Sequence, residues 1–152
     1  GMRWLYDRLA AKRIVQGLLV SGVMASLVAT GAVMCAEHPY QYTYFGLLAG
    51  SRDLIRVRFD MDYWGISGLQ ALERILEADP RPRIVVSGPW AGGESRELLP
   101  KSERQRIVYT SDVRKADYFV THFRFHAEGY EYPEWKAIKV GGTTIAMIYK
   151  LR

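Results

Sequence analysis

Two carboxylates stand close together in the middle of the chain, Asp60 and Asp62, with Met61 between them. Carboxylate oxygens suit a divalent cation, and such a pair can hold a metal together with the diphosphate of a sugar nucleotide. In an extended strand both side chains would lie on one face. However, no further carboxylate follows at residues 63–65. The pattern therefore favours no metal site, and we expect Asp62 to accept hydrogen bonds from a nearby turn.

Histidines are the second group that could bind a metal or move a proton. His122 and His126 lie four residues apart, and His38 is remote from both. On one strand the pair would share a face but stand about 13 Å apart, at roughly 3.3 Å per residue. That separation is too large for one metal ion unless the strand ends between them. We therefore expect neither a histidine metal site nor catalysis by a histidine.

A glycine-rich segment at residues 88–93, GPWAGG, follows an expected strand and precedes an expected helix. Backbone amides in that setting can bind phosphate. The segment lacks the Lys-Ser/Thr of a phosphate-binding loop and the glycine spacing of a dinucleotide site. Ser67 and Ser87 also lack the surroundings of a nucleophile elbow. We expect a connecting loop here, and no catalytic residue, metal or cofactor in this chain.

The longest element that the sequence predicts is a transmembrane helix at residues 14–36, a run without any charged side chain. As a helix it would reach roughly 34 Å, enough to cross a hydrocarbon core of about 30 Å. A cleaved signal peptide is the main alternative, but its apolar part is normally about 7–15 residues long. Met34 also stands where cleavage after Ala36 would need a small side chain.

Charge around this run predicts its orientation. Arg3, Arg8, Lys12 and Arg13 oppose only Asp7 before it, and 17 basic and 15 acidic residues follow it. Basic residues gather on the cytoplasmic side of a span. We therefore expect residues 1–13 to be a cytoplasmic flank and the domain after the span to be periplasmic or extracellular. The small positive surplus after the span does not favour nucleic acid as a partner.

Small residues recur at every fourth position along the span. This spacing lets helix backbones approach closely in lipid, so it predicts packing against other transmembrane helices or subunits. The alternative is that glycine and alanine are simply common in bacterial spans. The lone Cys35 is expected to face lipid or a neighbouring helix. The predicted packing residues are Gly17, Ser21, Ala25 and Ala29 in one stripe and Gly22, Ser26 and Thr30 in the next.

An interfacial linker is expected at residues 37–50. Pro39 ends the helix, and aromatic residues crowd the segment as they do at the lipid headgroups. We expect Tyr40, Tyr42, Tyr44 and Phe45 at this membrane interface, with Trp64 of the following domain also held near it.

Residues 51–152 are long enough for one domain. A helix at 67–78 has a plausible N-cap at Ser67 with Gln70 three residues on, the spacing of a capping box. Gly141-Gly142 between two apolar runs predicts a hairpin. The resulting class is an α/β domain with a mixed sheet that ends in a β-hairpin. We expect strand-like alternation at 56–64, strands at 83–87, 106–110, 117–125, 135–140 and 143–151, and a second helix at 94–99.

Two motifs resemble a known family. A span followed by HPYQY and then by DYWG is similar to the C-terminal region of bacterial GT-C type membrane glycosyltransferases, relatives of the protein mannosyltransferases. Gly46 stands where that pattern has an Asn after the aromatic pair. The motif residues are His38, Pro39, Tyr40, Gln41 and Tyr42, then Asp62, Tyr63, Trp64 and Gly65.

The resemblance implies a fold, a partner and a setting, which is a bacterial inner membrane with the C-terminal domain in the periplasm. Such enzymes transfer a sugar from a polyprenyl-phosphate carrier on the periplasmic face, and their catalytic carboxylate lies on a loop between early spans. This chain carries no such loop, so the resemblance implies a non-catalytic anchor and periplasmic domain. It would be either the C-terminal piece of a longer enzyme or a separate homologue acting as a partner subunit. An accessory subunit of another membrane complex and a soluble binding protein released by cleavage are the alternatives.

Overall fold

The computed structural model of the chain describes residues 4, 13–43, 45, 50–89, 93–124 and 126–152. Two compact units make up the chain, Gly1–Tyr44 and Phe45–Arg152. Most of the predicted cytoplasmic flank, Tyr44 and Gly46 lie outside the described residues.

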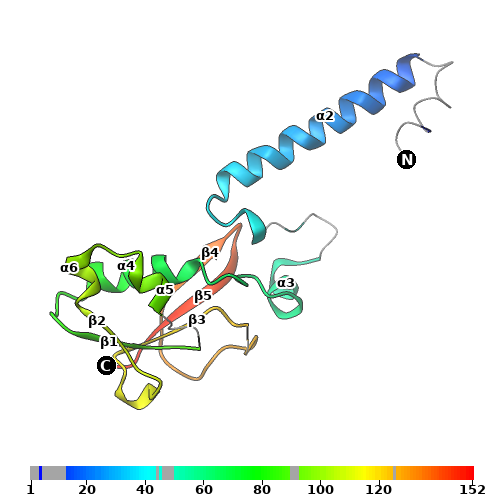
Figure 1. Ribbon diagram of the computed structural model, residues 1–152. Coiled ribbons are helices and arrows are strands. Elements are labelled where there is room, and N and C mark those ends of the chain that lie inside the picture. The colour runs from blue at the N-terminus through cyan, green and yellow to red at the C-terminus, as the bar shows by residue number, and fades with distance from the viewer. Residues whose placement is uncertain (1–3, 5–12, 44, 46–49, 90–92, 125) are drawn as a thin grey trace. The chain divides into compact units, whose positions relative to one another are not determined.

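The first unit is dominated by one uninterrupted helix, α2, Arg13–Ala36 (Figure 1). It has 24 residues, and none of them is buried. Within the described part of the chain, α2 is the helix that is long and apolar enough to cross a membrane. The predicted apolar helix is therefore confirmed, with its start one residue earlier. A turn containing Pro39 follows, and then a short 3-10 helix, η1, Gln41–Thr43.

A five-stranded mixed sheet forms the centre of the second unit, with strand order β2-β1-β3-β5-β4 (Figure 1). β1 pairs in parallel with both β2 and β3, whereas β5 is antiparallel to β3 and β4. The predicted α/β class is thus confirmed. The strands are β1 Ile84–Ser87, β2 Ile107–Tyr109, β3 Tyr118–Thr121, β4 Glu134–Val140 and β5 Thr143–Lys150.

The terminal hairpin forms where the sequence predicts it. β4 and β5 pair through a two-residue turn, with Val140 opposite Thr143. Gly141 and Gly142 have φ values of 53° and 87°. Both lie in the left-handed region that side chains disfavour, and two-residue hairpin turns of this kind match the twist of the strands.

Both faces of the sheet are covered, which explains why every residue of β3 is buried. Because side chains alternate along a strand, Tyr118 and Val120 point to one face and Phe119 to the other. Tyr118 reaches the end of helix α4, Ser67–Ala78. Phe119 belongs to a cluster on the opposite face, with Phe123, Met147, Tyr149 and the partly buried Tyr130 and Tyr132.

Helix α4 has the predicted bounds, because its apolar residues recur at helical spacing. Ala71, Leu72, Ile75 and Leu76 are buried along one side, and α4 contacts both strands of the hairpin. The predicted N-cap is wrong: Ile66 occupies that position, and Ser67 lies inside the helix.

The strand-like alternation expected at 56–64 is also wrong. Its first part belongs to a helix, α3, Arg52–Arg58, and residues 61–64 form a turn. Ile55 is buried, and α3 contacts β5, so a tertiary contact overrides the local alternation. The remaining elements are short: α5 Gly93–Glu97, α6 Lys101–Arg104 and η3 Val113–Lys115. The second predicted helix thus ends at Glu97, and the strand predicted at 117–125 ends at Thr121.

Candidate functional site

The small residues of α2 are accessible within the described chain. A methyl group added at Gly17 or Gly22 would meet no other atom within 4 Å. Such a face leaves the helix backbone open to close approach by another helix. Of the seven predicted packing residues, Thr30 is partly buried, and Gly17, Ser21, Gly22, Ala25, Ser26 and Ala29 are exposed.

The HPYQY segment forms a compact turn after α2. The peptide bond between His38 and Pro39 is cis, and Gln41 Nε2 lies 2.6 Å from His38 Nδ1. The Tyr40 N–H donates to the Glu37 carbonyl at 2.7 Å. Among the predicted interface residues, Tyr40 is 7% exposed and Tyr42 is partly buried.

In the second unit, the DYWG motif builds the start of α4. Asp62 is 1% exposed, and its carboxylate accepts hydrogen bonds from the backbone N–H groups of Ile66 and Ser67, both at 3.0 Å. The Ser67 hydroxyl donates to the same carboxylate. The first amides of a helix lack partners within the helix, and a negative charge there is stabilised. The predicted role of Asp62 as an acceptor in a turn is confirmed, and Asp62 provides the cap that the sequence assigned to Ser67.

The other motif residues make the turn possible and expose two rings. Gly65 has a φ of 66°, in the left-handed region, and its N–H donates to the Asp62 carbonyl at 3.0 Å. Tyr63 is 49% exposed and Trp64 73%. Their rings meet edge to face, with centroids 5.0 Å apart.

The two candidate metal carboxylates serve different purposes. Asp60 is exposed, and its carboxylate lies 3.7 Å from Arg124 Nε. Asp62 is buried and turned toward the helix amides. Across the described ranges, no group of three or more His, Cys, Asp or Glu side chains could hold a metal ion.

His122 follows the carboxyl end of β3 and is 5% exposed. Burial lowers the pKa of its imidazole, while the nearby Asp62 carboxylate acts in the opposite direction. His126 is exposed, and its ring stacks on Tyr130 at 4.7 Å. β3 ends before both histidines. They therefore do not share a strand face: His122 lies in the interior and His126 at the surface.

Ser87, at the carboxyl end of β1, is 3% exposed, and Ser67, at the start of α4, is 0% exposed. A Cβ at Gly88 would lie 2.1 Å from the Val120 carbonyl oxygen, so the two backbones approach too closely for any side chain. The glycine-rich loop expected after this strand lies partly outside the described residues, which omit 90–92.

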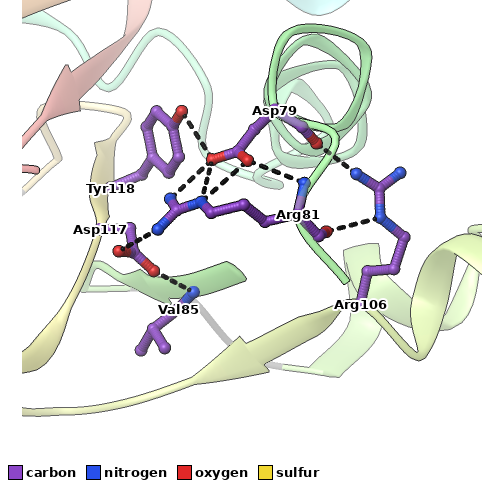
Figure 2. Close-up of polar contacts among 6 residues, drawn as sticks. All are labelled: Asp79, Arg81, Val85, Arg106, Asp117 and Tyr118. Carbon is purple, nitrogen blue, oxygen red and sulfur yellow. Dashed lines mark hydrogen bonds and ion pairs between the residues drawn. The ribbon is translucent and has the colours of Figure 1, made fainter. Parts of the chain in front are cut away.

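A polar cluster that the sequence did not predict lies at the amino ends of β1 and β3 (Figure 2). Arg81 joins two carboxylates that are almost entirely buried, Asp79 at 6% and Asp117 at 8% exposed. Its guanidinium donates to Asp79 Oδ2 at 2.7 Å and to Asp117 Oδ1 at 3.0 Å. Such charge-assisted bonds are stronger than neutral ones.

Further bonds tie this cluster to the backbone and to β3. Asp117 Oδ2 accepts from the Val85 N–H at 2.7 Å, and the Tyr118 hydroxyl donates to Asp79 Oδ2 at 3.1 Å. Arg106 donates to the carbonyl oxygens of Asp79 and Arg81 (Figure 2). The Arg81 hydrogen bond is the largest influence lowering the pKa of Asp79 to about 2, and burial raises the pKa of Tyr118 to about 12. The cluster therefore fastens the end of α4 to β1 and β3.

Comparisons with protein-family models, with curated proteins and with solved structures find no match to this chain. Function is therefore inferred from the chain's own residues. Two features are relevant: an apolar helix with an open small-residue face, and a second unit in which the Asp62 carboxylate binds the amides at the start of α4.

Proposed function

We propose that this chain is the membrane-anchored, non-catalytic outer domain of a glycosyltransferase that uses polyprenyl-phosphate-linked sugar. It acts as the C-terminal part of such an enzyme or as a separate homologous subunit. In this proposal α2 lies in a bacterial inner membrane, with residues 1–13 cytoplasmic and the α/β unit periplasmic. The resemblance of HPYQY and DYWG to the GT-C enzymes motivates the sugar chemistry, and the length and apolarity of α2 support the anchor.

The observation that carries the non-catalytic role is the position of Asp62. A carboxylate that acts as a base or binds a metal must reach its ligand, whereas Asp62 is 1% exposed. Its two oxygens accept from two backbone amides and a hydroxyl of α4. This use of the motif carboxylate supports a structural role for DYWG, with the chemistry supplied by a partner or by another part of the enzyme.

The second part of the proposal concerns α2. A helix that only anchors a domain needs no small-residue face, because lipid chains pack against any apolar surface. Ala25 and Ala29 are exposed on one such face, and Gly17 has open space around it. We infer that this face packs against the helices of the catalytic membrane part.

Enlarging this face tests the proposal. The double variant Ala25→Leu with Ala29→Leu adds bulk where close helix packing is expected. The control is Val20→Leu with Val23→Leu. Because successive residues are about 100° apart around the helix axis, these two positions lie on the opposite side from Ala25 and Ala29. The full chain is purified from its native membrane in mild detergent and assayed for sugar transfer from a polyprenyl-phosphate donor.

We expect transfer activity to co-purify with the unaltered chain and with the valine control, and to be lost with the alanine variant. Equal activity in both variants would contradict the packing role of this face. Membrane helices that co-purify without any transfer activity would instead identify an accessory subunit of another complex.

A further inference from the structure

The second unit carries a set of exposed apolar side chains that the proposed function does not use, although the sequence predicts that one of them, Trp64, lies near the membrane interface. The set runs through α3 and the turn before α4, and its side chains are between 40% and 73% exposed. We call it the 54–66 surface. Its members are Leu54, Val57, Phe59, Tyr63, Trp64 and Ile66.

Its first part comes from the amphipathic character of α3. Ile55 is 6% exposed and faces the interior, and α3 contacts β5. Leu54, Val57 and Arg58 are spaced three and four residues apart, so they share the other side of the helix and are exposed. Phe59 extends the apolar side, with its ring 4.8 Å from that of Phe45.

Arginines border the surface. The Arg124 guanidinium lies 4.3 Å from the centre of the Tyr63 ring, and its Nε forms an ion pair with the Asp60 carboxylate at 3.7 Å. Arg56 lies over the Phe123 ring at 4.6 Å, and Arg58 is exposed. Aromatic rings with arginines beside them are typical of surfaces that lie among lipid headgroups.

We propose that the 54–66 surface lies on an anionic phospholipid bilayer, with Trp64 and Tyr63 among the headgroups and Arg58 near lipid phosphates. This inference rests on the membrane association of the proposed function and does not depend on glycosyl transfer. It gives the outer unit a second contact with the membrane, separate from α2.

The covalent chain favours lipid over a protein as the occupant. α2 ends at Ala36 and α3 begins at Arg52. The 15 residues between them span at most about 50 Å even when fully extended. If α2 crosses a bilayer, the start of α3 is therefore held within about 50 Å of the membrane, and this tethering makes a weak contact effectively intramolecular. A small patch with one strongly exposed indole is then sufficient.

The fluorescence of the Trp64 indole can report whether this surface contacts lipid. The chain has four tryptophans, and Trp4→Phe, Trp90→Phe and Trp135→Phe together leave Trp64 as the sole indole. The full chain is placed in nanodiscs of phosphatidylcholine and phosphatidylglycerol whose acyl chains carry bromine both near the headgroups and near the chain ends, so that indoles at either depth are within reach. Bromine quenches only indoles that it approaches closely.

Two matched probes complete the design, each in a background that also carries Trp64→Phe. Leu98→Trp places the indole at an apolar position that is 70% exposed but outside the 54–66 surface. Leu27→Trp places it within α2. Emission from each protein is compared in brominated and unbrominated nanodiscs.

We expect brominated lipid to remove most of the emission of Trp64 and of the Leu27→Trp probe, and little from the Leu98→Trp probe. Quenching of the Leu27→Trp probe without quenching of Trp64 would overturn this inference and leave the membrane anchor standing. If neither Trp64 nor the Leu27→Trp probe is quenched, both this inference and the membrane anchor are wrong. Equal quenching of Trp64 and the Leu98→Trp probe would also overturn the inference, as would Trp64 emission that responds only to an added protein partner.

Discussion

Replacing Arg81 with methionine removes the cation that joins Asp79 and Asp117, while keeping much of the aliphatic side chain. In the folded protein this leaves two carboxylates that are 6% and 8% exposed without their shared guanidinium. Buried charge without a partner is costly. We therefore expect the Arg81→Met variant to fold less stably than the unaltered protein.

The pKa of Asp79 sets the size of the effect. It lies at about 2, below the ordinary 3.8. At about 1.4 kcal/mol per pKa unit, this depression corresponds to about 2.5 kcal/mol of stability at neutral pH. Breaking a fully buried ion pair costs about 3–5 kcal/mol. The smaller value is reasonable because the Arg81 side chain is 46% exposed, so water replaces part of the lost interaction.

The sign of the pH dependence follows from the same values. Because the pKa of Asp79 is lower in the folded state than in the unfolded chain, its contribution is complete above about pH 4. The contribution is lost as the pH falls through about 2. The stability difference between the two proteins should therefore shrink on acidification, to about half of its neutral value near pH 3.

The assay is urea unfolding of the full chain in detergent micelles, followed by near-ultraviolet circular dichroism. Trp135 and Tyr118 supply a local signal, because their rings lie 5.4 Å apart and Tyr118 bonds to Asp79. The matched control is Arg114→Met, since Arg114 also pairs with an aspartate two residues earlier but is 87% exposed. We expect the control to unfold at the same urea concentration as the unaltered protein. A loss for Arg81→Met that equals the control, or that is unchanged from pH 7 to pH 3, would refute the reasoning.

Two further changes test the other close contacts of the second unit. Asp62→Ala removes the acceptor of two helix amides and a hydroxyl, so urea unfolding should show a loss of about 2 kcal/mol. The exposed Asp60→Ala should change stability by less than about 0.5 kcal/mol, and similar losses for the two variants would argue against the cap. Gly88→Ala places a Cβ 2.1 Å from the Val120 carbonyl oxygen, so thermal unfolding should show a loss of about 1–3 kcal/mol as β1 and β3 are forced apart. The control is Gly31→Ala in α2, where an added Cβ would meet no atom within 4 Å; it should leave the thermal midpoint of the second unit unchanged. An unchanged midpoint for Gly88→Ala would contradict the close approach of β1 and β3.

Local patterns predicted most of the elements. The uncharged run 14–36, the helical spacing of Leu72, Ile75 and Leu76, and the Gly141-Gly142 turn each involve residues that are neighbours in sequence. Helix α2, helix α4 and the terminal hairpin accordingly appear close to their predicted bounds. The strand expected at 56–64 failed because its alternating residues are also compatible with a short helix, and the contact with β5 decided between them.

The candidate site was predicted only in part. Asp62 was correctly expected to accept hydrogen bonds from a turn, because an aspartate a few residues before a helix often does so. The cap was nevertheless assigned to Ser67, since its hydroxyl and Gln70 matched the usual spacing. The signal that was missed is Gly65, whose φ of 66° turns the chain so that Asp62 reaches the helix amides.

By itself, the sequence determined the length and apolar character of α2, the positions of most helices and strands, and the hairpin turn, because the energies behind these features depend on adjacent residues. Only the tertiary structure decided the strand order, the burial of Asp62 and His122, and the joining of Asp79 to Asp117 through Arg81. Arg81 and Asp117 lie 36 positions apart, and Tyr118 lies 39 positions after Asp79. Such contacts depend on burial and on the pairing of β1 with β3, which no local pattern of residues specifies.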